Sequence, residues 1–188
     1  MAPVDRWSFR AAIKRGIYMV PVNRQIEGLI PVFSVEENIA LPSIARNGAG
    51  LRLDWGAISA VAQRIIDRLA IKVDDRRDPI GSLSGGNQQK VVIGKWLARG
   101  GVRVLLLDEP SRGVDVGARE QIHELIRRMA RGGVACLVVS SEVEELLALC
   151  HRILLVGDGG NVSDIPATTT ESELTAMMLR GTSGRAAA

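Results

Sequence analysis

Short apolar runs separated by an amphipathic segment constrain the fold of this chain more than any other feature. The runs cover residues 102–107, 134–139 and 153–156 and consist mostly of Val, Leu and Ile. Between the first two, residues 117–131 carry apolar side chains at helical spacing. Near-continuous apolar strands that alternate with helices are typical of a parallel sheet whose two faces are both covered. The sequence therefore predicts an α/β fold in which all three runs are parallel strands.

The beginning of the chain predicts one short strand followed by a helix. Residues 17–20 are β-rich and are followed by a proline and a polar loop. Ser34 and Glu37 have the spacing of a capping box, which predicts a short helix over residues 35–41. We expect Pro42 to end that helix, because proline lacks the N–H that a helix interior requires.

Two further helices follow from cap and periodicity signals. Residues 43–53 contain the run Asn-Gly-Ala-Gly at positions 47–50 and predict a loop, after which Asp54 caps a strongly periodic helix that extends to Leu69. Near the end of the chain, Thr170 and Glu173 form a second capping-box pattern. Together with the apolar runs, these signals divide the chain into four parts: an N-terminal remnant (1–16), a strand and helical region (17–101), the core parallel strands (102–165), and a C-terminal helix with a frayed tail (166–188).

Composition excludes several classes of protein. The 24 Lys and Arg residues are scattered and nearly balanced by 21 Asp and Glu, and aromatic residues make up only 3%, so we expect no nucleic-acid partner. No apolar run approaches the ~18 residues of a membrane span. No charged segment followed by an apolar one opens the chain, so we expect a cytoplasmic protein.

Two adjacent acids follow the first apolar run and form a candidate site. Asp108 and Glu109 stand where a parallel strand ends, and ligands of α/β sheets gather at that edge. Buried carboxylates are costly unless a cation uses them, and Mg²⁺ bound to phosphates is a common partner. An ordinary acidic turn after a strand is the alternative interpretation.

A glycine turn before a helix forms a second candidate site. Ser84, Gly85 and Gly86 precede an amphipathic segment, so a hydroxyl, unhindered backbone N–H groups and the positive end of a helix dipole would meet at one place. This combination suits an anion such as phosphate. The alternative is that the turn only caps the helix.

Taken together, the two motifs resemble those of ABC-transporter ATPases. Residues 83–86 read Leu-Ser-Gly-Gly, like the family's signature motif, and the run ending in Asp-Glu-Pro that begins eighteen residues after Gly86 resembles its Walker B strand. Residues 87–90 and 110–118 are similar to the second cassette of bacterial monosaccharide importers of the ribose, xylose and galactose kind. The resemblance extends from about residue 16 to residue 160 and implies a P-loop NTPase-like fold with a helical subdomain at residues 35–69.

The resemblance implies a role for each site residue. Asp108 would hold Mg²⁺ through water, and Glu109 would be the catalytic residue that polarises the water attacking the γ-phosphate of ATP. Residues 84–86 would press on the γ-phosphate of a nucleotide held by an opposite cassette. Partners would be that second cassette and the permease subunits, at the cytoplasmic face of the bacterial inner membrane.

Four more residues take nucleotide-binding roles by the same resemblance. Asn87 and Gln88 extend the signature motif, Asp115 lies in the loop that would cross the cassette interface, and Ser141 stands where the family has a switch histidine. A hydroxyl does not supply the hydrogen bond of an imidazole at the same reach.

The sequence also departs from the family pattern. None of its residues forms the G-x-x-x-x-G-K-[ST] motif that cradles phosphates, so we expect an N-terminally truncated cassette. The family's Q-loop glutamine aligns near Val22, with Gln25 offset from it. A second hypothesis is therefore a non-catalytic remnant or interaction module that keeps the fold. Missing edge strands would leave apolar faces uncovered, which predicts association or poor solubility.

Overall fold

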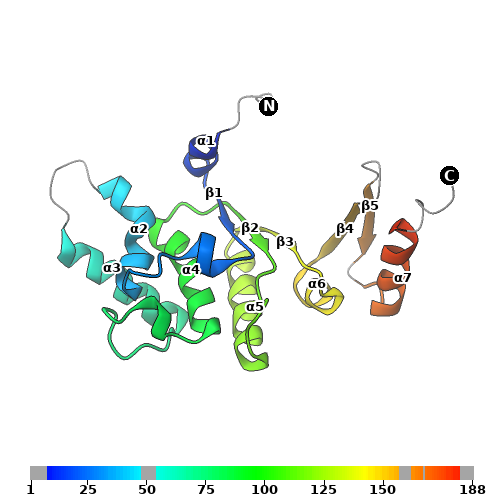
Figure 1. Ribbon diagram of the computed structural model, residues 1–188. Helices are drawn as coiled ribbons and strands as arrows, with labels where there is room; N and C mark the ends of the chain where they lie inside the picture. Colours follow the sequence, from blue (N-terminus) through cyan, green and yellow to red (C-terminus); the bar gives the residue numbers. More distant parts are fainter. Residues whose placement is uncertain (1–7, 48–53, 157–161, 167, 183–188) are drawn as a thin grey trace. The chain divides into compact units, whose positions relative to one another are not determined.

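The computed structural model describes residues 8–47, 54–156, 162–166 and 168–182 (Figure 1). These residues belong to two compact units, the first ending at Leu137 and the second starting at Val138. Within the described ranges, no helix has the length and apolar character that crossing a membrane requires.

A sheet of three strands organises the first unit, and only Val138 and Val139 of its third strand are counted in the second unit. Its order is β1 (Ile17–Val20), β2 (Val104–Asp108) and β3 (Ala135–Val139). β1 and β2 run parallel, in a register that pairs Ile17 with Val104 and Val20 with Leu107. Both strands bury alternate residues, as expected where side chains alternate between the faces of a sheet. The short strand predicted at residues 17–20 is confirmed, and the structure adds its parallel pairing with the first apolar run.

Three helices pack side by side next to this sheet: α2 (Val35–Asn47), α3 (Trp55–Leu69) and α4 (Gly85–Arg99) (Figure 1). Asp54 caps α3 by accepting a hydrogen bond from the Ala57 N–H, as the sequence predicts. α4 is the most deeply buried helix of the group, with Val91, Val92 and Ile93 fully inaccessible.

Shorter elements complete the first unit. α1 (Phe9–Lys14) precedes β1, and η2 (Arg24–Gly28) is a π-helical turn within the segment predicted as a polar loop. η3 (Ile80–Ser82) leads into α4, and α5 (Val116–Arg131) packs against α4, close to its predicted bounds. The buried residues of α5 include Ile122, Ile126 and Met129, as its periodicity predicts.

The prediction that Pro42 ends the first long helix is wrong. α2 continues through Pro42 to Asn47, and its buried residues Ile39 and Ala40 pack among the neighbouring helices. A proline inside a helix removes one hydrogen bond and disfavours the helical turn before it. Here tertiary contacts offset that cost, and the Arg99 guanidinium donates to the Pro42 carbonyl oxygen. Residues 48–53 of the predicted loop lie outside the described residues.

In the second unit, the predicted third parallel strand is also corrected. β4 (Arg152–Val156) pairs antiparallel with β5 (Val162–Pro166), a strand that the sequence analysis did not predict. Only five residues separate the two strands, and a parallel connection needs a crossover of a dozen or more. Proximity along the chain therefore selects a hairpin.

The rest of the second unit consists of two helices, α6 (Val143–Leu149) and α7 (Glu171–Thr182). Ile153, Ile165 and Leu174 form its core. The predicted capping box before α7 is confirmed, since the Thr170 N–H donates to Glu173 Oε2 at 2.9 Å.

The prediction that the second apolar run is covered on both faces is wrong for the described structure. Leu137 and Val139 of β3 are 55% and 58% exposed. β3 stands at the end of the strand order, whereas β2 lies between two strands. No residue of β3 is buried, whereas Leu105 and Leu107 of β2 are almost completely buried.

Candidate functional site

The first element of the site is the capped beginning of α4. Ser84 is the N-cap, and its Oγ accepts a hydrogen bond from the Asn87 side-chain amide at 3.0 Å. The side-chain oxygen Oδ1 of Asn87 in turn accepts from the Lys72 N–H at 3.0 Å, which holds the side-chain amide in place. Ser84 is exposed and Gly85 half-buried. The N-terminus of this fifteen-residue helix, with its first-turn N–H groups, is therefore accessible at Ser84 and Gly85.

Close approach of neighbouring segments requires a glycine at position 86 and leaves little room at position 85. A Cβ on Gly86 would lie 2.3 Å from the Cβ of Ala118 in α5, and one on Gly85 would lie 2.7 Å from Arg24 Nη2. The beginnings of α4 and α5 are thus in contact. Asp115 caps α5 by accepting from the Ala118 N–H at 2.9 Å. Two capped helix N-termini consequently lie side by side, an arrangement that favours negative charge.

The acidic pair lies at the carboxyl end of the central strand. Asp108 is the last residue of β2, and Glu109 follows with a φ of +48°. This left-handed conformation is uncommon for a residue with a side chain and is found preferentially at functional turns. Pro110 and Ser111 are buried directly after it, whereas both carboxylates are half-buried. The pair therefore stands at the edge of the sheet where the sequence predicts it.

The two carboxylates can be compared with the donor sets that metals use in proteins. Among the described residues, no three His, Cys, Asp or Glu side chains gather as a metal cage would require. Mg²⁺ is usually bound through one or two carboxylates together with phosphates and water. A pair of accessible acids at a strand end fits that donor set.

Gln88 faces the protein interior. Its side chain is buried, and its amide donates to the carbonyl oxygens of Leu83 at 3.1 Å and Ile80 at 3.4 Å. Gln88 therefore braces the segment that leads into the Ser84 turn. Its Oε1 is buried without a hydrogen-bond partner.

Two basic residues that sequence reasoning missed connect this region. Lys90 donates to Gln121 Oε1 of α5 at 2.8 Å and to the Ala70 carbonyl oxygen at 2.9 Å; burial, and secondarily the charge of Lys72, lower the pKa of Lys90. Arg24 contacts the loop after β2 and the turn formed by residues 84–86, which we call the signature turn. No spacing rule links either residue to its partners, because the contacts span many residues of the chain.

The positions expected for the switch histidine and the Q-loop glutamine belong to other elements of the chain. Ser141 belongs to the second unit, in the turn that leads into α6. Val22, at the expected Q-loop position, follows β1 and is half-buried, and Gln25 is exposed in η2.

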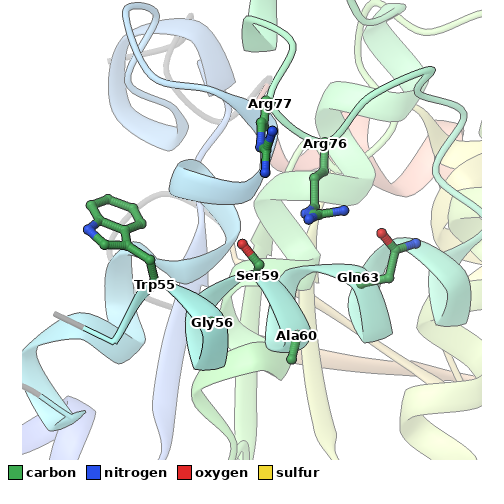
Figure 2. Close-up of a pocket in the computed structure, with 7 residues that line it drawn as sticks. All are labelled: Trp55, Gly56, Ser59, Ala60, Gln63, Arg76 and Arg77. Carbon is green, nitrogen blue, oxygen red and sulfur yellow. The ribbon is translucent and has the colours of Figure 1, made fainter.

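A separate open cavity of about 560 Å³ lies on α3 (Figure 2). The residues that line it come from α3 and the loop before η3: Trp55, Gly56, Ser59, Ala60, Gln63, Arg76 and Arg77. Arg76 forms an ion pair with Glu36 at 2.9 Å, and Ser59 donates to the same carboxylate at 2.8 Å. None of the sequence-predicted site residues lines this cavity.

The parallel strands, the acidic strand end and the capped glycine turn place both candidate motifs in an α/β fold. The family model described as ABC transporter matches residues 4–112, more than half of the chain. The chain belongs to the ABC transporter family.

The chain is also similar to curated and solved proteins. It is 40% identical to the ABC transporter ATP-binding protein YphE of Escherichia coli (strain K12) over 94% of its own length and 35% of that protein. It is 39% identical to the arabinose import ATP-binding protein AraG of Rhizobium etli over 90% of its length and 34% of that protein. The chain thus spans about a third of the length of these relatives.

A solved structure confirms the fold class. The structure is a dimeric ATP-binding cassette in a post-hydrolysis state with ADP and Pi, which matches with a TM-score of 0.69 over 88% of this chain and 70% of that one. Sequence identity is 21%, so the similarity concerns the fold alone.

Proposed function

We propose that this chain is the ATP-binding component of a sugar ABC importer, or a part of it, and contributes the signature side of an ATP site shared with a second cassette. One observation carries the proposal: two capped helix N-termini meet at the Gly86–Ala118 contact, with exposed Ser84 at the edge of the pair. Relatives named as arabinose import proteins support the sugar class.

The residues present fit a triphosphate and Mg²⁺. Ser84 Oγ and the first N–H groups of α4 would donate to a γ-phosphate, and Asp115 would hold the α5 N-terminus beside it. Bound MgATP supplies the phosphoryl group that is transferred to water. At the other ATP site of the paired assembly, on this chain's own side, Asp108 would bind the metal through water, and Glu109 would orient and deprotonate the attacking water.

Asn87 and Gln88 have different roles in this proposal. Asn87 reaches the Ser84 hydroxyl and so lies close to a phosphate bound there. Gln88, whose amide is used inside the protein, would act by fixing the turn. Ser141 would replace the family's switch histidine.

Partners and location are part of the same proposal. The helices α2 and α3 would contact the permease subunits, and the exposed Trp55 on α3 offers an apolar contact there. The assembly would lie at the cytoplasmic face of the inner membrane.

The test is a charge substitution that preserves the helix cap. Asp and Asn both cap helices well, but only Asp adds a negative charge. Association of the chain with a cassette that carries a phosphate loop is measured in MgATP. We expect Ser84→Asp to weaken this association about tenfold or more, because the carboxylate repels the γ-phosphate, and Ser84→Asn to change it about twofold at most. Equal association of both variants with the wild type would contradict the proposal.

A second candidate function is an interaction module without turnover of its own. It is favoured by Ser141 and by the lack of a G-x-x-x-x-G-K-[ST] motif in these 188 residues. Purified chain should then show no ATP hydrolysis by itself, and measurable turnover that Glu109→Gln abolishes would refute this candidate.

A further inference from the structure

Arg24 joins three segments that lie far apart in the sequence. It is the first residue of η2, and three residues separate it from the end of β1. Its Nη1 donates to the Arg112 carbonyl oxygen at 2.9 Å, and its Nη2 donates to the Gly113 carbonyl oxygen at 3.2 Å. These two carbonyls belong to the loop that connects β2 to the Asp115 cap of α5.

The signature turn forms the third side of this contact. A Cβ on Gly85 would lie 2.7 Å from Arg24 Nη2 and 3.2 Å from the Gly113 carbonyl oxygen. Gly85 therefore leaves room for the guanidinium between α4 and the loop. Gly113 has a φ of +67°, a conformation that favours glycine. The carbonyl that Arg24 Nη2 binds therefore belongs to a backbone turn that few other residues would adopt.

The chemistry of the side chain matches this position. A guanidinium is planar and carries five N–H donors in a fixed fork, so it can bind two consecutive carbonyls at once. A lysine in the same place would offer a single donor atom. Arg24 Nε is buried without a hydrogen-bond partner, and burial lowers the pKa of Arg24. Placing this cation here costs desolvation free energy, which the two carbonyl bonds offset in part.

We propose that Arg24 is the positioning residue that holds the loop carrying Gly113 and Asp115 against the Ser84–Gly85 turn, so that both helix N-termini face one ligand. This inference rests on the proposed function for its catalytic consequence. Its structural part, restraint of residues 112–115 by Arg24, stands independently. Through η2, Arg24 also connects the segment after β1 to that loop.

The first test needs neither nucleotide nor partner. Hydrogen exchange of the amides of residues 112–116 is measured in the full chain for the wild type, Arg24→Gln and Arg24→Lys, with Arg68→Gln as the matched control on the exposed face of α3. We expect exchange to be about tenfold faster in Arg24→Gln, with a smaller increase in Arg24→Lys and none in the control. Unchanged exchange in Arg24→Gln would overturn the proposal. So would a uniform increase over the whole first unit, because it would indicate general destabilisation.

The second test measures turnover in the complex of the full chain with its phosphate-loop cassette. We expect Arg24→Gln to lower kcat about tenfold while KM for ATP stays within about twofold, and Arg24→Lys to recover part of the loss. Faster loop exchange with normal kcat would overturn the positioning role. If Ser84→Asp leaves association unchanged, the proposed function fails, and the exchange measurement still decides whether Arg24 restrains the loop.

Discussion

Lys95 is a cation held inside the first unit. The residue is only 7% exposed; its ammonium donates to the Gly28 carbonyl oxygen and lies 5.2 Å from the centre of the Trp96 ring. Trp96 stacks on Tyr18 of β1 at 4.8 Å. These contacts attach α4 to the end of η2 and to β1. Burial lowers the pKa of Lys95 to about 8.

This lowered pKa predicts stability that increases at alkaline pH. Unfolded lysine keeps its proton to about pH 10.4, so above about pH 8 the unfolded chain binds more protons and the free energy of unfolding rises with pH. Between about pH 7.5 and 9.5, we expect the wild type to gain about 2 kcal/mol relative to Lys95→Met, as measured by urea denaturation. Parallel pH profiles of the two proteins would show that Lys95 keeps its ordinary pKa.

Gly86 permits the contact between α4 and α5. Because a Cβ there would lie 2.3 Å from the Ala118 Cβ, Gly86→Ala is expected to destabilise the chain by about 1–3 kcal/mol. Ala118→Gly in the same chain should restore part of this loss, although glycine in a helix costs about 1 kcal/mol. A double-mutant cycle measures the coupling, and strictly additive effects would contradict a direct clash.

At the scale of elements, the beginning of α2 depends on a reciprocal cap. The Ser34 N–H and hydroxyl donate to Glu37 Oε2 at 2.7 and 2.8 Å, and the Glu37 N–H donates to Ser34 Oγ at 3.3 Å. The hydrogen bond from the Ser34 backbone, followed by that from its hydroxyl, lowers the pKa of Glu37. The predicted capping box is confirmed.

Loss of this cap should have a pH-dependent cost. We expect Ser34→Ala to lower the free energy of unfolding by about 1 kcal/mol near neutral pH. A carboxylate with a lowered pKa stabilises the fold above its unfolded pKa and loses this contribution as pH falls. The difference between the variant and the wild type should therefore shrink in acid, as guanidinium denaturation at both pH values would measure. Ser34→Thr, which keeps a hydroxyl, serves as control, and an equal loss in both variants would argue against the cap.

For the whole molecule, exposed apolar residues on the sheet predict self-association. Met19 of β1 is 45% exposed and Leu137 of β3 is 55% exposed, in the two outer strands of the described order. Exposed apolar side chains on outer strands favour association.

Light scattering should therefore detect a mass that increases with concentration. Leu137→Lys should reduce that increase, because a charge on an outer strand opposes pairing with another strand. The control, Arg68→Lys on the exposed face of α3, should leave the increase unchanged. A monodisperse wild-type monomer would contradict this expectation.

Local signals in the sequence determined much of this protein. The caps at Ser34, Asp54 and Thr170 act over three residues, and helical periodicity acts over a few turns, so neither depends on distant segments. The Asp108–Glu109 strand end and the Ser84 turn could be predicted because they too are local patterns. The spacing between them indicated the family.

Only the tertiary structure decided which distant segments meet. Arg24 binds a carbonyl 89 positions away, Gly86 meets Ala118, and α2 continues through Pro42 because its neighbours bury it. Residues 152–156 pair with 162–166 instead of joining the parallel sheet. Such contacts depend on packing and on the entropy of closing each loop, and both are properties of the whole folded chain.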